Sequence, residues 1–311
     1  MGRKLMSTLA VLSLILQTIS AMNVICYHGT WSRYRSGNGS LKISDIDASL
    51  CTHYIYAFVG LDSSTYEVVS LDSWLDISLN GFADAVALKE SNSNLKVLLA
   101  IGGWNEGSAK YSTMASNSTN RATFISSVIS MLQTYSFDGF DVDWEYPARR
   151  DSTNSEDKEN FALLLKELRE AFDTYGFILT AAVSATPSSA DISYDVPSLS
   201  TYLDSINLME YDYFGAWDDV TGHNAPLNGQ SVYFGTTYAE YNLHSSVYGW
   251  IERGADPSKL ALGIPLYGRT FTLSNSSSNG VGAAVSGAGP AGPYTASAGF
   301  LGIQRDFGRV R

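Results

Sequence analysis

The chain has 311 residues, enough for one large hydrophobic core and for little else of comparable size. Hydrophobic residues make up 45% of the sequence and charged residues 16%, which is typical of a folded globular protein and excludes a disordered one. The formal net charge of -11 repels phosphate backbones and anionic lipid, so we expect neither nucleic acid nor a membrane as partner.

The first 21 residues have the layout of a secretory signal peptide. Arg3 and Lys4 precede an apolar run over residues 9–16, and the small residues Ser20 and Ala21 follow it. The apolar run is too short for a membrane span. We therefore expect cleavage near Ala21 and a secreted, extracellular protein. Glycosylation sequons that begin at Asn38, Asn117 and Asn275 agree with this route.

The sequence contains two cysteines, Cys26 and Cys51. In an oxidising compartment they are expected to form a disulfide, which closes a loop worth about 3 kcal/mol in the chain-entropy model. Neither cysteine lies in a CxxC motif, which argues against a redox or zinc role. The four histidines are scattered without metal-ligand spacing, so we expect no metal site. We also expect no cofactor.

Short apolar runs alternate with helical or loop segments along the rest of the chain. Seven of these runs predict strands, at residues 24–28, 53–60, 96–102, 139–146, 178–184, 206–213 and 260–267. The clearest helix is predicted over residues 156–175, where apolar side chains recur at helical spacing: Phe161, Leu164, Leu165, Leu168 and Phe172. Alternating strands and helices indicate a parallel sheet covered by helices, and seven strands favour a barrel over an open nucleotide-binding sheet.

Seven strands are one fewer than a closed barrel of this kind needs. From residue 274 to 299 the composition shifts to Ser, Gly, Ala and Pro, and no further strand is evident. Either the last strand is missing or the count is off by one, and we favour the first. The expected organisation is a signal peptide at 1–21, a catalytic barrel at 22–269, and a partial insertion domain with a divergent tail at 270–311.

The most informative stretch is residues 138–147, which read DGFDVDWEYP. Residues two apart on a strand share a face, so Asp141, Asp143 and Glu145 point one way and the apolar residues between them point the other. With the apolar set packed under the helices, the three carboxylates line the barrel interior and Glu145 lies at the carboxyl end, where barrel enzymes carry their sites. Repulsion among them is expected to raise at least one pKa, as a general acid near neutral pH requires.

This stretch resembles the catalytic signature of glycoside hydrolase family 18, the chitinases and their relatives, especially those of animals. Four further motifs resemble the family in the same order, at residues 26–31, 99–104, 207–213 and 265–269. The resemblance runs from the mature start to about residue 302. It implies an α/β fold, a (β/α)8 TIM barrel with the start of a small α+β insertion after strand 7.

The resemblance also implies the chemistry, in which the 2-acetamido oxygen of the substrate attacks the anomeric carbon in place of a second carboxylate. Glu145 would protonate the leaving oxygen and later activate water. Asp143 would orient the acetamido N–H, Asp141 would tune Asp143, and Tyr211 would donate its hydroxyl to the acetamido oxygen. The other site residues implied for substrate binding are Tyr27, Trp31, Phe58, Trp104, Tyr146, Met209, Asp212, Trp217 and Arg269.

The end of the sequence departs from the family. The resemblance implies that relatives continue after residues 299–302 with a Cys, the rest of the insertion and an eighth strand that carries a Trp. This chain reads IQRDFGRVR over residues 303–311 instead, so we expect the eighth strand to be missing and the isolated product to be poorly stable and weakly active.

The expected function is an endo-acting chitinase that hydrolyses β-1,4 linkages of N-acetylglucosamine polymers with retention. Its expected partners are chitin or chitooligosaccharides, and we expect a monomer. The alternative is a lectin-like protein of the same family that binds chitin oligomers without cutting them. The commonest cause of lost activity in such proteins is replacement of the glutamate, and this chain keeps Glu145.

Overall fold

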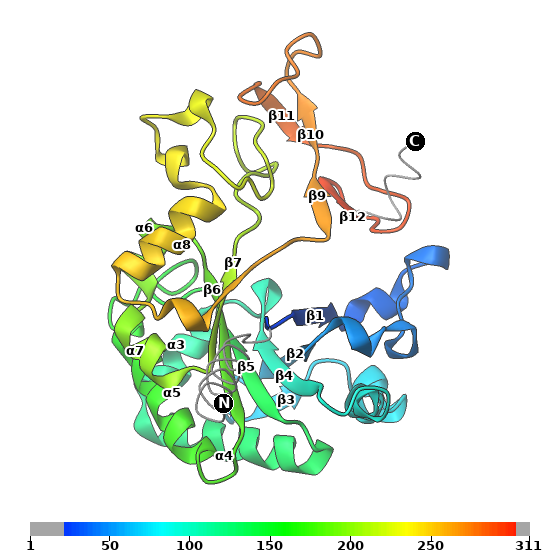
Figure 1. Ribbon diagram of the computed structural model, residues 1–311, viewed down its shortest axis with the longest axis vertical. Coiled ribbons are helices and arrows are strands. Elements are labelled where there is room, and N and C mark those ends of the chain that lie inside the picture. The colour runs from blue at the N-terminus through cyan, green and yellow to red at the C-terminus, as the bar shows by residue number, and fades with distance from the viewer. Residues whose placement is uncertain (1–21, 303–311) are drawn as a thin grey trace, which may run out of the picture.

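The computed structural model describes residues 22–302. Its main body is a curled sheet of eight strands with helices on its outer face (Figure 1). Seven strands are parallel and follow the order β1-β2-β4-β5-β6-β7-β8. Their bounds are β1 Ile25–Gly29, β2 His53–Leu61, β4 Lys96–Gly102, β5 Gly139–Asp143, β6 Ile178–Ser184, β7 Ser205–Met209 and β8 Leu260–Leu262. The short strand β3, Val68–Ser70, pairs antiparallel with β2.

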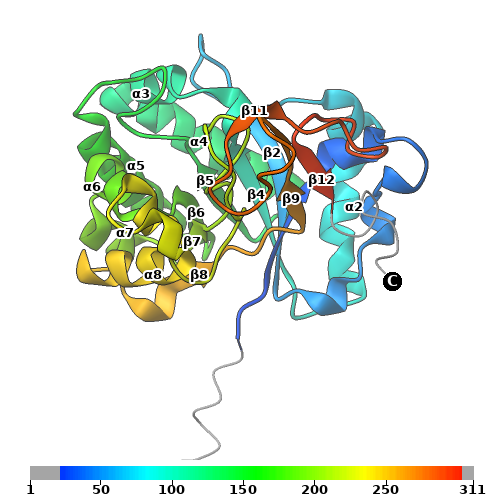
Figure 2. The ribbon, with the colours of Figure 1, turned by 90° about the horizontal axis from the view of Figure 1, so that it is seen from above.

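The helices pack against one face of this sheet (Figures 1 and 2). They are α2 Gly81–Ala87, α3 Ala109–Ser116, α4 Ser118–Tyr135, α5 Asp157–Phe172, α6 Pro187–Ser193, α7 Val196–Tyr202 and α8 Leu243–Glu252. The five apolar residues predicted to form one face of the helix at 156–175 are all buried in α5, which confirms its amphipathic pattern. Within the described residues no helix is both long and apolar enough to cross a membrane.

The parallel barrel-like sheet agrees with the fold expected from the sequence. Hydrogen bonding in the described part runs from β1 at one edge to β8 at the other, and these two strands do not pair with each other. The sequence prediction was too long at three strands. Strand β5 makes its last pairing with β4 at Asp143. Asp212, three residues beyond β7, has a left-handed φ of 58°, and Pro265, three residues beyond β8, has no N–H to donate to a ladder.

A smaller unit follows β8 and lies over the upper end of the sheet (Figure 1). Strand β9, Tyr267–Arg269, pairs antiparallel with β12, Phe300–Gly302. Strand β10, Phe271–Leu273, pairs antiparallel with β11, Val285–Ala288. Because β9 precedes residue 270 and β12 follows it, this small sheet joins the chain segments on both sides of the boundary expected there.

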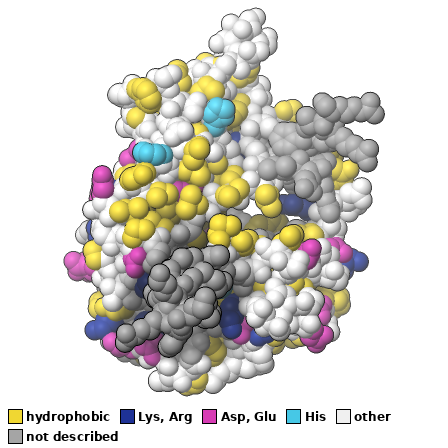
Figure 3. Space-filling model, in the orientation of Figure 1, with side chains coloured by type: hydrophobic (Ala, Val, Ile, Leu, Met, Phe, Trp, Pro, Cys, Tyr) yellow, Lys and Arg dark blue, Asp and Glu magenta, His cyan; other side chains and the backbone are white. Residues whose placement is uncertain are grey.

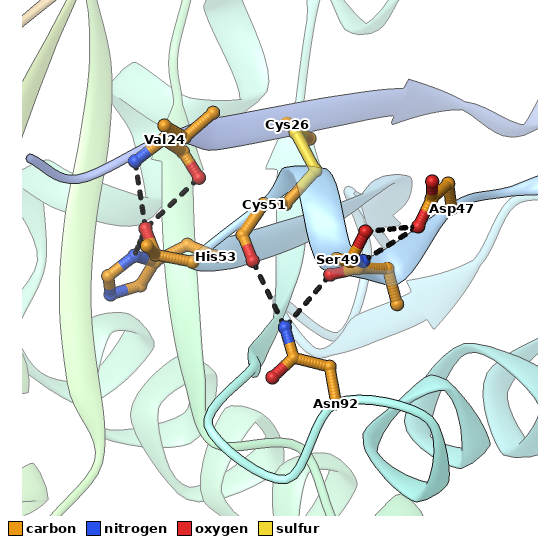
Figure 4. Close-up of a disulfide and its surroundings, with 9 residues drawn as sticks. Val24, Cys26, Asp47, Ser49, Cys51, His53 and Asn92 are labelled. Atoms are coloured by element: carbon orange, nitrogen blue, oxygen red, sulfur yellow. Dashed lines mark hydrogen bonds between the residues drawn. A yellow bond between two sulfur atoms is a disulfide. The ribbon is translucent and has the colours of Figure 1, made fainter.

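A disulfide joins Cys26 in β1 to Cys51 just before β2, as the sequence predicted (Figure 4). Around it, the side chain of Asn92 donates to the carbonyls of Ala48 and Cys51, and the hydroxyl of Thr52 bonds to the backbone of Val24 (Figure 4). The disulfide and these hydrogen bonds fix the first strand against its neighbour at the end opposite the acidic motif.

The end of β8 and the segment that leads from it to β9 are apolar and exposed. Leu262, Ile264 and Leu266 are each more than half exposed. Hydrophobic side chains gather across the middle of this face in the space-filling view, over the region where this segment runs (Figure 3).

Candidate active site

The three carboxylates of the DGFDVDWEYP motif form a buried row at the carboxyl end of β5. Asp141 is 0% exposed, Asp143 is 4% exposed, and Glu145, two residues beyond the strand, is 9% exposed. The apolar residues that alternate with them face the helices: Phe140 packs on Phe124 of α4, and Trp144 packs on Phe161 of α5. The alternation of the sequence therefore separates an apolar outer face of β5 from an acidic inner one.

Asp141 is satisfied by three donors from other strands. Its carboxylate accepts hydrogen bonds from the Tyr27 hydroxyl of β1 at 2.9 Å, from the Thr180 hydroxyl of β6, and from the Asn207 side chain of β7 at 3.3 Å. Asn207 also donates to the Tyr27 hydroxyl at 2.7 Å. Burial raises the pKa of Asp141 to about 6, although the three hydrogen bonds act in the opposite direction.

Asp143 and Glu145 have fewer hydrogen bonds than Asp141, and burial raises the pKa of both. Within the described part of the chain, Oδ1 of Asp143 is buried with no hydrogen-bond partner. Burial raises the pKa of Asp143 well above its usual range, and the charges of Glu145 and Asp141 raise it further. Burial also raises the pKa of Glu145 to about 7, while a hydrogen bond from Tyr146 and the charge of Arg150 lower it. Repulsion was expected to raise at least one of these pKa values, and it does so for Asp143, although burial is the largest cause for all three acids.

Residues at the end of β7 face the acids from across the interior. Met209 ends the strand, and Tyr211 follows it; burial raises the pKa of Tyr211, and the charges of Asp143 and Glu145 add to this shift. Asp212 forms a bidentate ion pair with Arg269 of β9, with both N–O distances at 2.6 Å. The structure thus brings these predicted site residues to one end of the sheet.

Three tryptophans flank this end with their rings 55–60% exposed: Trp31, Trp104 and Trp217. A side chain packs against each of the three indole rings. Trp31 stacks on Phe58 with ring centroids 6.1 Å apart, Trp104 lies against Arg150, and Trp217 lies against Arg269. An exposed indole with a fixed backing is suited to stacking against the apolar face of a sugar ring.

Tyr146 completes the set of predicted residues. It follows Glu145 directly, and its carbonyl accepts a hydrogen bond from the buried Ser108 hydroxyl at 2.8 Å. The same hydroxyl accepts a hydrogen bond from the indole of Trp144 at 2.7 Å. Ser108 thereby connects the loop after β4 to the chain on both sides of Glu145.

Sequence reasoning missed several residues of this site. Thr180 and Asn207 donate to Asp141, and a signal for them existed, because Asn207 lies two residues before Met209 on the same face of β7. Tyr267 of β9 and Phe300 of β12 stack with their ring centroids 4.6 Å apart, and Arg269 lies close to both rings. The contact between Tyr267 and Phe300 joins two segments that are far apart in the sequence, so no local sequence pattern predicts it.

A family model and several known proteins match most of the chain. Glycosyl hydrolases family 18 matches residues 23–306 of the chain. Probable chitinase 2 of Drosophila melanogaster is 45% identical over 289 residues, which cover 90% of this chain and 57% of the fly protein.

Solved structures are similar over most of the chain as well. The Group IV chitinase of Ostrinia furnacalis in complex with allosamidin has a TM-score of 0.87 at 49% identity, covering 91% of this chain and 76% of that one. Human YKL-39, described as a pseudo-chitinase with retained chitooligosaccharide binding properties, has a TM-score of 0.84 at 37% identity, covering 92% and 77%. The chain spans 55–62% of the length of three of the curated relatives it matches and 12% of a fourth. By its match over residues 23–306, the chain belongs to glycosyl hydrolase family 18.

Proposed function

We propose that the protein is an endo-acting chitinase that hydrolyses β-1,4 linkages of N-acetylglucosamine polymers with retention of configuration. The observation that carries this proposal is the buried acidic row, in which the pKa of Glu145 is raised to about 7. A carboxyl group with such a pKa holds its proton near neutral pH and can give it to a leaving oxygen.

In the proposed mechanism Glu145 protonates the glycosidic oxygen as the bond to the anomeric carbon breaks. The 2-acetamido oxygen of the same sugar attacks that carbon and forms an oxazolinium-like intermediate. Asp143 holds the acetamido N–H and stabilises the positive charge, and Tyr211 donates its hydroxyl to the acetamido oxygen. Glu145, now ionised, removes a proton from water, which opens the intermediate and restores the starting configuration.

The surroundings of the acids support these roles. The unpartnered Oδ1 of Asp143 is a buried acceptor that a substrate N–H would satisfy. The three donors to Asp141 hold that side chain in place beneath Asp143. The exposed tryptophans supply flat surfaces on which neighbouring sugars can stack.

A lectin-like protein that binds chitooligosaccharides without cutting them is the second candidate. The exposed tryptophans favour binding whether or not hydrolysis follows, and YKL-39 is described as a pseudo-chitinase that retains such binding. Glu145 distinguishes the two candidates, because a protein that only binds has no need for a buried glutamic acid with a raised pKa.

We also propose that the protein is secreted. The signal-peptide pattern lies at residues 1–21, outside the described residues. The disulfide supports an oxidising compartment, and the three sequon asparagines, Asn38, Asn117 and Asn275, are all exposed.

The deciding experiment is hydrolysis of a fluorogenic chitotrioside by the wild-type chain, Glu145→Gln, and Glu159→Gln as a matched control. Glu159 is an exposed glutamate on α5. We expect Glu145→Gln to lose at least about 10³-fold in kcat and to keep chitooligosaccharide binding, and Glu159→Gln to behave as the wild type.

The stereochemistry is checked separately by NMR of the first product formed from chitohexaose. The β-anomer at early times supports retention, and an initial α-anomer excludes it. A wild-type chain that binds chitohexaose tightly and releases no product would establish the lectin-like candidate instead.

A further inference from the structure

The loop at residues 147–156, between Glu145 and α5, carries a side chain that contacts both the catalytic segment and a tryptophan. The guanidinium carbon of Arg150 lies 3.6 Å from the centroid of the Trp104 ring, the shortest cation–ring distance in the described part of the chain. Its Nη1 donates to the Trp104 carbonyl at 3.0 Å and to the Glu145 carbonyl at 2.9 Å. One planar group therefore links the loop after β4 to the backbone of the general acid.

The position of Arg150 is imposed by the loop around it. Ala148 and Arg150 both have left-handed backbones, with φ of 59° and 64°, which non-glycine residues adopt only when their surroundings require it. The buried carboxylate of Asp157 holds the loop in this backbone conformation. It accepts hydrogen bonds from the hydroxyls of Ser112 and Ser152, from the Ala148 N–H and from the Asn154 side chain.

A second carboxylate fastens the same loop to the segment that carries Trp104. Asp151 accepts hydrogen bonds from the backbone N–H groups of Ser108, at 2.8 Å, and Ala109, at 3.2 Å. Both carboxylates lie within seven residues of Arg150 along the chain, on its C-terminal side. The guanidinium is thus held over the indole by contacts that leave the outer face of the ring untouched.

An indole ring that is 59% exposed would lose rotational freedom on binding a sugar. Arg150 covers one face and removes that freedom in advance, so the other face is already oriented for stacking. Because Nη1 of Arg150 also donates a hydrogen bond to the Glu145 carbonyl, the orientation of the Trp104 ring is fixed relative to Glu145. A sugar that stacks on Trp104 is then placed at a fixed distance from the proton donor.

We propose that Arg150 is a positioning residue that determines chain-length specificity by fixing the Trp104 platform relative to Glu145. The proposal rests on the proposed function of the site. Oligomers long enough to reach Trp104 gain binding from the fixed ring, and shorter oligomers do not. Arg150 contacts no substrate itself and acts through Trp104.

The test measures binding of chitotriose to chitohexaose by calorimetry in a Glu145→Gln background, together with kcat and KM of the active chain. Arg150→Ala should weaken binding of the longest oligomers about 5- to 10-fold and that of the shortest less than 2-fold. In the active chain, at a pH well below the pKa of Glu145, where this residue is protonated in both proteins, the loss should appear chiefly in KM. Arg150→Lys keeps the charge without the planar fork, so it should recover less than half of the loss.

A double-mutant cycle separates positioning from a general structural effect. Once Trp104→Ala has removed the ring, Arg150→Ala should change binding less than 2-fold further. The matched control is Lys166→Ala, which removes a cationic side chain on the exposed part of α5. It should leave all constants unchanged.

The outcomes distinguish this proposal from the proposed function. Oligomer binding that Arg150→Ala weakens equally at every length, or equally with and without Trp104, overturns the role of Arg150 and leaves the chitinase proposal intact. If the Glu145→Gln protein binds no chitooligosaccharide and the wild type cleaves none, the proposed function fails and this inference fails with it.

Discussion

At the scale of single residues, the site depends on the cost of burying carboxylates. Glu145 is the member of the row whose proton would be transferred, and burial holds its pKa near 7. The charge of Arg150 and a hydrogen bond from Tyr146 keep that pKa from rising further. The acid is therefore poised to exchange its proton close to neutral pH.

The first prediction concerns the pH dependence of hydrolysis. Because Glu145 must be protonated to act, kcat/KM should be highest below pH 7 and should fall about tenfold per pH unit above its pKa. Initial rates on a chitotrioside between pH 4 and pH 9 check this. Since Asp143 titrates together with Glu145, the midpoint belongs to the pair. Rates that stay flat up to pH 9 would exclude Glu145 as the proton donor.

The second prediction concerns Tyr27, whose hydroxyl donates to Asp141 and accepts from Asn207. Tyr27→Phe removes a donor that lowers the pKa of Asp141, so that pKa rises above about 6. Because the lost bond served the ionised form, the loss of stability should be small at pH 5 and about 1–3 kcal/mol at pH 8. Urea unfolding at both pH values checks it, with the exposed Tyr248→Phe as control. An equal loss at both pH values contradicts the argument.

At the scale of strands and helices, a further acid, Glu210, is buried directly after β7 and outside the active site. Glu210 is fully buried, and the backbone N–H of Gly263 acts against the effect of this burial on its pKa. Burial raises its pKa to about 8. Burial raises the pKa of Tyr213, the charge of Glu210 adds to this shift, and the Tyr213 hydroxyl forms a hydrogen bond with Ser246 of α8. The proposed mechanism does not use Glu210, which costs stability when it ionises.

The third prediction follows from that burial. The folded pKa of Glu210 lies above its unfolded value of 4.5, so the folded state binds the extra proton and stability falls as pH rises from about 4.5 towards 8. Glu210→Gln removes this titration. It should stabilise the protein little at pH 5 and by about 2–3 kcal/mol at pH 8, as measured by urea unfolding. Stabilisation that does not grow with pH would show that Glu210 is not protonated in the folded state.

Elements buried on both faces could be predicted from the sequence, and elements defined by partners far along the chain could not. Strand β4 was predicted with its observed bounds because burial on both faces requires an uninterrupted apolar run. The ends of β5 and β7 were misplaced, because the acids and Tyr211 extend the strand-like alternation past the last ladder bond. The pairing of β9 with β12 had no local signal at three residues each.

The candidate site divides in the same way. The spacing of Asp141, Asp143 and Glu145 placed them on one face, since period two is a local property of a strand. The dominance of burial over repulsion could not be predicted, because it depends on how closely the other strands pack around the acids. Arg150 gave no signal at all, since its position depends on the left-handed backbone of a loop.

At the scale of the whole molecule, the first strand is held from two directions. The disulfide joins Cys26 to Cys51 at a sequence separation of 25, and Asp141 accepts a hydrogen bond from Tyr27 in the interior. The first constraint is covalent and acts mainly on the unfolded chain. The second exists only in the folded state.

The fourth prediction concerns the covalent constraint. Replacing Cys26 and Cys51 together by Ala should lower the free energy of unfolding by about 3 kcal/mol, the loop-closure value for a separation of this size. Urea unfolding with and without reductant checks it. Reductant should destabilise the wild type by a similar amount and leave the double variant unchanged. A wild type that is insensitive to reductant while unfolding would contradict a stabilising disulfide.

The hydrogen bond between Tyr27 of β1 and Asn207 of β7 makes the proposed activity depend on the correct assembly of the sheet. Both residues also bind Asp141, so the acids are held in place only when strands from distant parts of the chain meet correctly. In a library of core variants, colonies that clear a chitin plate would then be enriched for correctly assembled molecules. Selection for activity would serve directed evolution as a screen for foldedness, without any separate assay of stability.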